Sequence, residues 1–209
     1  MNLAIFGATG RSGRHLVEQA LAAGHAVTAH ARDPSRIQVQ HERLKVVRGD
    51  VQTGAEVSEA IEGQDAVLSA LGHVRGSAKD VHAVGTGHIL RQMQAHGVRR
   101  LVSLTGAGVR DERDPPYWGA ALPRFLLNVI APGVLPDAEE HARLIRESDR
   151  DFVIVRAPRL TDGGRTGTYR TGYLKLGLGA SISRADVADF MLKQLADDTY
   201  LRQAPMVSY

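Results

Sequence analysis

Three glycines at a spacing of three residues lie close to the start of the sequence, within Gly7-Ala8-Thr9-Gly10-Arg11-Ser12-Gly13. An apolar run, residues 3–6, precedes them, and an amphipathic run, residues 14–23, follows. This order predicts a strand, a tight turn and a helix. Glycine lets backbone approach a ligand that a Cβ would block, and the free N–H groups at a helix start attract anions. The turn is therefore predicted to hold a dinucleotide pyrophosphate through Gly7, Thr9, Gly10, Arg11, Ser12 and Gly13. The alternative is a glycine-rich turn without a ligand.

Two arginines follow the second predicted strand, residues 25–31, where dinucleotide sites distinguish their cofactors. An acid at this position binds a ribose 2′-hydroxyl, whereas basic residues accept a 2′-phosphate. Here Arg32 and Arg36 stand at the strand's end, and Arg11 is a third candidate. The nearest acid, Asp33, directly precedes Pro34 and is interpreted as a turn residue. Forked guanidinium groups bind phosphate well, so NADP(H) is predicted in preference to NAD(H).

Three further strand ends are predicted to contact the same cofactor. Ligands in open parallel sheets bind at the carboxyl ends of strands. Asp50 and Val51 follow the third predicted strand, and Asp50 is a candidate for the adenine amino group. The remaining candidates follow the fourth and fifth strands: Leu71, Gly72, Thr105 and Gly106.

The hydrophobic pattern predicts alternating strands and helices. Strands are expected over residues 3–6, 25–31, 44–47, 66–71, 100–104 and 152–156, with a small strand within 168–173. Helices are expected over 12–23, 56–61, 81–96, 137–148 and 185–196, with Ser183 as the N-cap of the last. This alternation indicates an α/β fold: a Rossmann-like, doubly wound parallel sheet in three layers. We expect one NAD(P)-binding domain over residues 1–209.

The regular rhythm breaks after the fifth strand. Residues 106–136 and 157–183 are expected to form a small substrate-side segment. Tyr117, next to the single tryptophan Trp118, either lines a flat apolar pocket or anchors the loop to the core. The apolar run 125–135 is expected to be buried, with an active-site roof and a dimer contact as alternatives.

Composition sets broad limits on the function. Hydrophobic residues make up 43% of the 209, which is enough for a core, and there is no cysteine. The formal charge of +3 comes from arginines spread along the chain, so no nucleic-acid partner is expected. No apolar run is long enough for a membrane span, and no signal-type leader is recognised. We expect a cytoplasmic protein.

The motifs form an ordered series that resembles a known family. The series comprises the glycine turn, Arg32-Asp33-Pro34-Ser35-Arg36, Gly49-Asp50-Val51 and Gly63-Gln64-Asp65-Ala66-Val67. It is similar to the atypical short-chain dehydrogenases with an NAD(P)H-binding, NmrA-like domain, and most similar to the biliverdin-IXβ reductase or flavin reductase (NADPH) group. The resemblance covers nearly the whole chain and implies hydride transfer from NADPH to a flavin, quinone-like or tetrapyrrole-like acceptor. Flavin would then be a substrate rather than a bound prosthetic group.

Two positions depart from that group's pattern. The resemblance implies a serine where this chain has Gly106, and a histidine where it has Arg159. Thr105 is the nearest hydroxyl to the expected nicotinamide, so it is the candidate catalytic residue. Arg159 and Tyr117 are the candidates on the substrate side, Arg159 for a carboxylate or phosphate. These departures put biliverdin reduction in doubt.

Other chemistries find no support in the sequence. No tyrosine is followed four residues later by lysine, so the usual proton-transfer dyad of short-chain dehydrogenases is absent. No metal site is expected, because the nine histidines lack ligand spacing. His141, beside Glu139 and Glu140, is expected on a solvated helix face.

The function hypothesis is an NADPH-dependent reductase of a small-molecule acceptor, active as a monomer or homodimer. The alternative is a non-catalytic, NADP(H)-sensing regulator that binds a partner protein, as in NmrA-like proteins. A sugar-nucleotide epimerase or dehydratase ranks third, because it needs the missing dyad.

Overall fold

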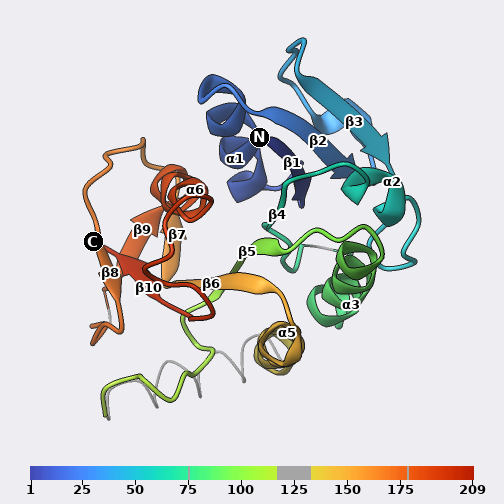
Figure 1. The fold of residues 1–209 in the computed structure, drawn as a ribbon. Coiled ribbons are helices and arrows are strands. Elements are labelled where there is room, and N and C mark those ends of the chain that lie inside the picture. Colours follow the sequence, from blue (N-terminus) through green and yellow to red (C-terminus); the bar gives the residue numbers. More distant parts are fainter. Residues whose placement is uncertain (75, 117–132, 178) are drawn as a thin grey trace.

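The computed structural model describes residues 1–74, 76–116, 133–177 and 179–209 (Figure 1). Its centre is an eight-stranded sheet, parallel except for an antiparallel edge strand at one side. In spatial order the strands are β3 (Leu44–Arg48), β2 (Ala26–Ala31), β1 (Asn2–Phe6), β4 (Ala66–Ser69), β5 (Arg100–Gly106), β6 (Asp151–Ala157), β10 (Met206–Ser208) and β8 (Arg170–Gly172). The order 3-2-1-4-5-6 is that of a doubly wound dinucleotide-binding sheet, which confirms the predicted fold class.

Helices cover both faces of this sheet (Figure 1). On one face, α1 (Arg11–Ala22) packs against α6 (Arg184–Lys193); on the other, α3 (Val81–Ala95) packs against α2 (Val57–Ile61) and α5 (Val134–Glu147). A 3₁₀ turn, η1 (Pro34–Arg36), follows β2. None of the helices in the described part of the chain combines the length and apolarity needed to cross a bilayer.

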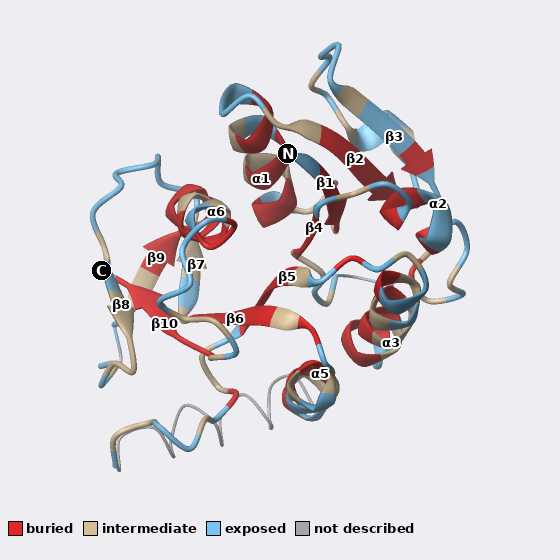
Figure 2. Cartoon of the chain, in the orientation of Figure 1, coloured by how far each residue is buried: buried red, intermediate tan, exposed pale blue. Residues whose placement is uncertain are grey.

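Alternating side chains of the central strands fill two cores. In β1, Leu3 and Ile5 belong to the core under α1 and α6, whereas Ala4 and Phe6 belong to the core under α2, α3 and α5. Successive side chains of a strand point to opposite faces, so a strand covered on both sides is apolar throughout. Figure 2 shows this burial in β1, β4 and β6, and the partial exposure of β3 at the sheet edge.

Element ends differ from the expectations in places that affect the site. β5 runs two residues beyond the predicted 100–104, because Thr105 and Gly106 pair with Arg156 and Ala157. β4 ends at Ser69 rather than at residue 71, which leaves Leu71 in the loop that follows. The helix predicted over 137–148 begins earlier, at Val134, since proline is tolerated in a first turn.

The C-terminal part contains strands that were not predicted. β10 extends the main sheet, and β7 (Arg159–Thr161) pairs with β9 (Ser181–Ser183) in a two-stranded sheet. The prediction that Ser183 caps the last helix is confirmed, because its Oγ accepts a hydrogen bond from Asp186 N at 3.0 Å. Most of the irregular segment, residues 117–132, lies outside the described residues.

Candidate active site

The glycine turn between β1 and α1 is closed by packing that only glycine permits. Gly7 has a φ of +74°, and a Cβ there would lie 2.5 Å from the carbonyl oxygen of Ala70. A Cβ on Gly13 would lie 2.0 Å from the carbonyl oxygen of Gly7. The turn therefore sits directly against the end of β4, and α1 packs tightly on the strand that precedes it.

The start of α1 leaves backbone donors free for an anion. Gly10 is the N-cap residue and has no side chain to cap the helix, and the first turn of α1 contains no acid. Gly10 N donates to Gly7 O at 2.9 Å. The amides that follow lie in the first turn of α1, where the helix itself offers no acceptor for them. The Arg11 side chain beside them is 74% exposed. Free amides, a positive helix end and close backbone approach fit a pyrophosphate.

Basic side chains gather at the carboxyl ends of β2 and β3. Arg32 and Arg36 are exposed after β2. Asp33 caps η1: its Oδ1 accepts from Ser35 N at 3.1 Å and from Ser35 Oγ at 2.6 Å, as expected for a turn residue. Those hydrogen bonds lower the pKa of Asp33, so it stays ionised within the turn.

Arg48 is a third basic residue at this position, which the sequence analysis did not select. It ends β3 and stands in register with Ala31, the residue before Arg32. The charges of Arg48 and Arg36 both lower the pKa of Asp33, which places both guanidinium groups near that carboxylate. Its position at the end of the strand next to β2 was the available signal.

The loops after β3 and β4 meet over the start of α3. Asp50 Oδ1 accepts from Gln52 N at 2.9 Å, which fixes the turn after β3. A Cβ on Gly85 of α3 would lie 3.0 Å from Leu71 Cδ1 and 3.2 Å from Val51 Cβ. Val51 and Leu71 are therefore close together, as two neighbouring strand ends should be. Their contact with a cofactor stays a prediction.

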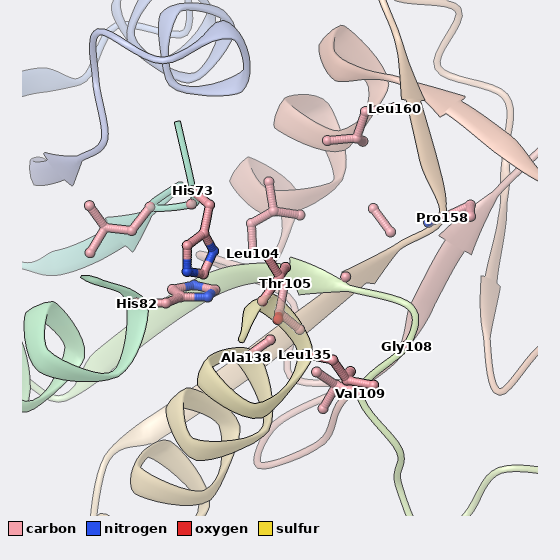
Figure 3. Close-up of a pocket in the computed structure, with 15 residues that line it drawn as sticks. His73, His82, Leu104, Thr105, Gly108, Val109, Leu135, Ala138, Pro158 and Leu160 are labelled. Carbon is pink, nitrogen blue, oxygen red and sulfur yellow. The ribbon is translucent and has the colours of Figure 1, made fainter. Parts of the chain in front are cut away.

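A cavity of about 270 Å³ lies beyond the ends of β4, β5 and β6 (Figure 3). Its walls come from the loop after β4, the end of β5 and the loop that follows, the start of α5, and the link from β6 to β7. Most lining side chains are apolar. The polar side chains that line it are His73, His82 and Thr105. The cavity and the glycine turn thus lie at the same end of the sheet, the carboxyl end of its parallel strands.

Thr105 and Gly106 line the cavity at the end of β5. Thr105 is 5% exposed, and its Oγ1 has no hydrogen-bond partner in the described part of the chain. No described atom lies within 4 Å of a Cβ built on Gly106, so the serine of the resembling family would fit there. An unpaired buried hydroxyl is costly, which makes Thr105 a good partner for a ligand.

The substrate-side predictions have a different outcome. Arg159 is exposed and does not line the cavity, whereas Pro158 and Leu160 on either side of it do. Alternation along β7 turns Arg159 to the other face. Its role in substrate binding stays a prediction. Tyr117 and Trp118 lie outside the described residues.

Three histidines and one aspartate form a polar group beside the cavity that the sequence analysis missed. His73 Nε2 lies 3.0 Å from Asp137 Oδ2. Asp137 also accepts hydrogen bonds from His82 N at 3.0 Å and Ala83 N at 2.9 Å. The His82 ring stacks on His141, with 3.8 Å between centroids. One signal was available: His73 directly follows Leu71 and Gly72, which were predicted to contact the cofactor.

The prediction that His141 lies on a solvated helix face is wrong. His141 is fully buried, and its Nδ1 lies 2.7 Å from Thr86 Oγ1 and its Nε2 3.3 Å from Ser103 Oγ. Burial lowers the pKa of His141 well below its ordinary value. Burial likewise lowers the pKa of His82 to about 4, and the charge of His73 adds to this effect. Both rings are therefore neutral near pH 7. No group of metal-ligating residues occurs among the described side chains.

Arg156 fixes the loop that carries Val109 to the cavity wall. The side chain is fully buried, and its guanidinium donates to Asp114 Oδ1 at 2.6 Å and Oδ2 at 2.7 Å. It also donates to the carbonyl oxygens of Val109 at 2.8 Å and Ala204 at 2.7 Å. One side chain of β6 thus holds both the loop after β5 and the approach to β10.

Comparison with known proteins identifies the family. Residues 7–198 match the family model described as NAD(P)H-binding. The chain belongs to the NAD(P)H-binding family. The chain is 31% identical over 192 residues to 3-diazoavenalumate denitrifying reductase from Streptomyces sp.. The match covers 82% of this chain and 60% of that protein. The chain thus spans less than two thirds of that relative's length.

Solved structures support the fold of this NAD(P)H-binding protein. It is similar to an anaerobilin reductase from Escherichia coli O157:H7, with a TM-score of 0.80, 20% identity, and 99% of this chain and 96% of that chain covered. It is also similar to a short-chain dehydrogenase/reductase from Veillonella parvula in complex with NADP, with a TM-score of 0.78, 20% identity, and coverages of 100% and 94%.

Proposed function

We propose that the protein is an NADPH-dependent reductase that transfers a hydride to a flavin, quinone-like or tetrapyrrole-like acceptor. The observation that carries the proposal is the position of the cavity. It opens at the carboxyl ends of β4, β5 and β6, and the glycine turn lies at the same end of the sheet. In a doubly wound sheet, a dinucleotide and its substrate meet at the carboxyl ends of the strands.

The choice of NADPH over NADH rests on charge. Arg32, Arg36 and Arg48 lie at the carboxyl ends of β2 and β3, where the 2′-phosphate is expected, and the acid beside Arg32, Asp33, is hydrogen-bonded to Ser35. Guanidinium groups bind a phosphate by charge-assisted hydrogen bonds. The complex of the Veillonella structure with NADP supports the same choice.

The acceptor class rests on the cavity walls. Leu71, Leu104, Val109, Leu135 and Leu160 offer apolar contact to a flat conjugated ring. The anaerobilin reductase and the biliverdin-IXβ reductase group both favour a tetrapyrrole-like acceptor, whereas the open position at Gly106 and the outward position of Arg159 favour other flat acceptors. We include all three classes in the test.

The protein's own residues then have defined tasks. When bound, NADPH supplies the hydride. The amides at the start of α1 hold the pyrophosphate, and the arginines hold the 2′-phosphate. Leu71 and Leu104 exclude water from the reacting atoms, and Thr105 hydrogen-bonds a polar group of nicotinamide or acceptor. We further propose that residues 1–209 act as one domain, as a monomer or homodimer in the cytoplasm.

The test is a steady-state assay of NADPH oxidation without oxygen, with FMN, a naphthoquinone and biliverdin as acceptors. We expect turnover with at least one, and a lower kcat/KM with NADH than with NADPH. Tight NADPH binding without turnover on any acceptor would contradict the proposal. It would favour the second candidate, an NADP(H)-sensing regulator that binds a partner protein.

That regulator is favoured by one observation, the absence of a serine at Gly106 and of a histidine at Arg159. A regulator that senses cofactor level rather than redox state would bind NADPH and NADP⁺ with similar affinity and retain a protein partner.

A further inference from the structure

We infer that His73, oriented by Asp137, donates the proton that completes reduction of the acceptor in the cavity. This inference rests on the proposed reductase function and adds a catalytic residue to it. It also narrows the substrate to acceptors whose reduced form must be protonated on an oxygen or nitrogen.

His73 lies where both the acceptor and solvent can reach it. It lies in the loop between β4 and α3 and lines the cavity with His82, Leu104 and Thr105 (Figure 3). Its side chain is 21% exposed, so it contacts both the cavity and solvent. A group that donates a proton at each turnover needs such access in order to be reprotonated.

One ring nitrogen of His73 is held by two acceptors. His73 Nε2 lies 3.0 Å from Asp137 Oδ2 and 3.0 Å from the carbonyl oxygen of Lys79. Both neighbours are acceptors, so Nε2 carries a hydrogen. In the described structure Nδ1 has no hydrogen bond, and it is the nitrogen left to exchange a proton with a ligand. A carboxylate that fixes one nitrogen while the other reacts is a recurring arrangement in acid–base catalysis.

Asp137 is itself held firmly in place. Its side chain is 3% exposed and accepts hydrogen bonds from two backbone amides at the start of α3, those of His82 and Ala83. The carboxylate therefore joins α5, α3 and the His73 loop. These contacts hold the carboxylate in place, so it fixes the orientation of the His73 ring at the cavity wall.

His73 differs from His82, the second histidine that lines the cavity. His82 is 4% exposed, and burial, followed by the charge of His73, lowers its pKa to about 4. It is neutral near pH 7. Two elements bring titratable groups to His73: α5 brings Asp137, and α3 brings His82. Its own loop contributes the backbone carbonyl oxygen of Lys79. Among the described residues, the His73 ring contacts a carboxylate, whereas His82 meets the same carboxylate through its backbone amide.

Proton transfer from His73 completes a two-electron reduction of the acceptor. An acceptor that gains a hydride from NADPH receives two electrons and develops negative charge on its conjugated oxygen or nitrogen. The Nδ1–H bond of the His73 imidazolium breaks, and the proton forms an O–H or N–H bond on that atom. Neutral His73 keeps the hydrogen on Nε2, which still donates to Asp137. Nδ1 then takes up a proton from solvent. The sum is acceptor, NADPH and one proton giving dihydro-acceptor and NADP⁺.

The experiment compares wild type with His73→Gln, His73→Asn and Asp137→Asn. The control is His41→Gln, because His41 is an exposed histidine before β3 that does not line the cavity. Rates with FMN, a naphthoquinone and biliverdin are measured across pH, and NADPH affinity is measured by nicotinamide fluorescence. We expect His73→Gln and His73→Asn to lower kcat by roughly 10²-fold, with unchanged NADPH affinity and little change in KM. The alkaline fall in rate of the wild type should disappear in both.

Asp137→Asn acts through His73, as a positioning residue. Loss of the carboxylate charge should move the alkaline fall in rate to lower pH, while the amide oxygen still accepts from the start of α3. His41→Gln should match wild type throughout.

The outcomes separate the two proposals. A wild type that reduces none of the acceptors overturns the proposed function, and this inference with it. An active wild type with an unchanged kcat and pH profile in the His73 variants overturns this inference alone. A wild-type rate without any alkaline fall does the same, and it needs no variant to be folded.

Discussion

A Cβ on Gly13 would lie 2.0 Å from the carbonyl oxygen of Gly7, and the two glycines therefore constrain each other. Gly13→Ala should force the turn open, at a cost of about 1–3 kcal/mol in the free energy of unfolding. The displaced amides should weaken NADPH binding more than tenfold. Thermal unfolding and fluorescence titration measure both.

Gly87→Ala is the matched control, because Gly87 lies within α3 and no described atom is within 4 Å of a Cβ there. It should preserve NADPH binding and leave stability unchanged or raised by up to about 1 kcal/mol. Equal NADPH affinity in Gly13→Ala and wild type would contradict the assignment of the turn.

Removing the arginines after β2 should change cofactor preference. Arg32→Ala with Arg36→Ala is expected to weaken NADPH binding by roughly tenfold or more, and NADH binding little, because only NADPH carries the 2′-phosphate. Arg48→Ala should act in the same direction. The effect should shrink at high salt. Arg91→Ala, an exposed arginine of α3, is the control, and equal losses for both cofactors would refute the assignment.

Thr105 should show opposite effects on stability and turnover. Its buried Oγ1 has no partner among the described residues, so Thr105→Val should leave stability unchanged or raise it by about 1 kcal/mol. If a ligand uses the hydroxyl, the same variant should lower kcat/KM about tenfold. Thr105→Ser keeps the hydroxyl and should keep most of the activity. A fully active Thr105→Val would exclude Thr105 from catalysis.

The neutral state of His82 should appear in the pH dependence of stability. Its pKa is about 4 in the folded protein, against 6.5 ordinarily. The unfolded chain therefore binds a proton first as pH falls, so stability is complete above pH 6.5 and is lost towards pH 4. His82→Phe should reduce that loss by roughly 3 kcal/mol. Urea unfolding at several pH values measures it, and a slope as steep as in wild type would contradict the burial of a neutral ring.

The Arg156–Asp114 pair should control both stability and acid sensitivity. Arg156→Met leaves Asp114 and two carbonyl oxygens without their donor and should cost about 3 kcal/mol. Arg143→Ala, which removes an exposed arginine with two ion pairs, should leave the melting temperature nearly unchanged.

Burial is the largest single influence on Asp114 and would raise its pKa. The hydrogen bonds from Arg156 and from the Asp111 backbone, together with the charges of Arg156 and Arg146, outweigh burial and lower that pKa below its ordinary 3.8. The stability that the pair contributes is therefore present above pH 3.8 and is lost as pH falls further. Asp114→Asn should flatten this acid limb. A limb that persists in Asp114→Asn would assign it to other carboxylates.

The parts of the fold that local patterns determine were predictable. Residues 66–68 of β4 and 152–155 of β6 are continuous apolar runs because both faces of the sheet are covered, and the turn at Gly7 combines glycine spacing with its flanking elements. β7, β9 and β10 have three residues each and carry no periodic signal, so their pairing depends on tertiary contacts.

The missed site residues share a different cause. His73, His82 and Asp137 become neighbours only when the β4 loop, α3 and α5 pack together, and no motif joins them along the chain. His141 was assigned to solvent from its glutamate neighbours, yet helical periodicity turns it inward beside Ala138 and Ala142. Arg156, which ends a predicted strand, gave no sign of its burial, because its partner Asp114 is 42 residues away.

The carboxylate that caps α3 also couples the two halves of the chain during folding. The amides of His82 and Ala83 donate to Asp137, which lies 55 and 54 residues further along the chain. We therefore expect the start of α3 to stay frayed during synthesis until α5 has docked. The N-terminal βαβ half then gains its last stabilisation from the C-terminal half, so the protein should fold cooperatively rather than half by half.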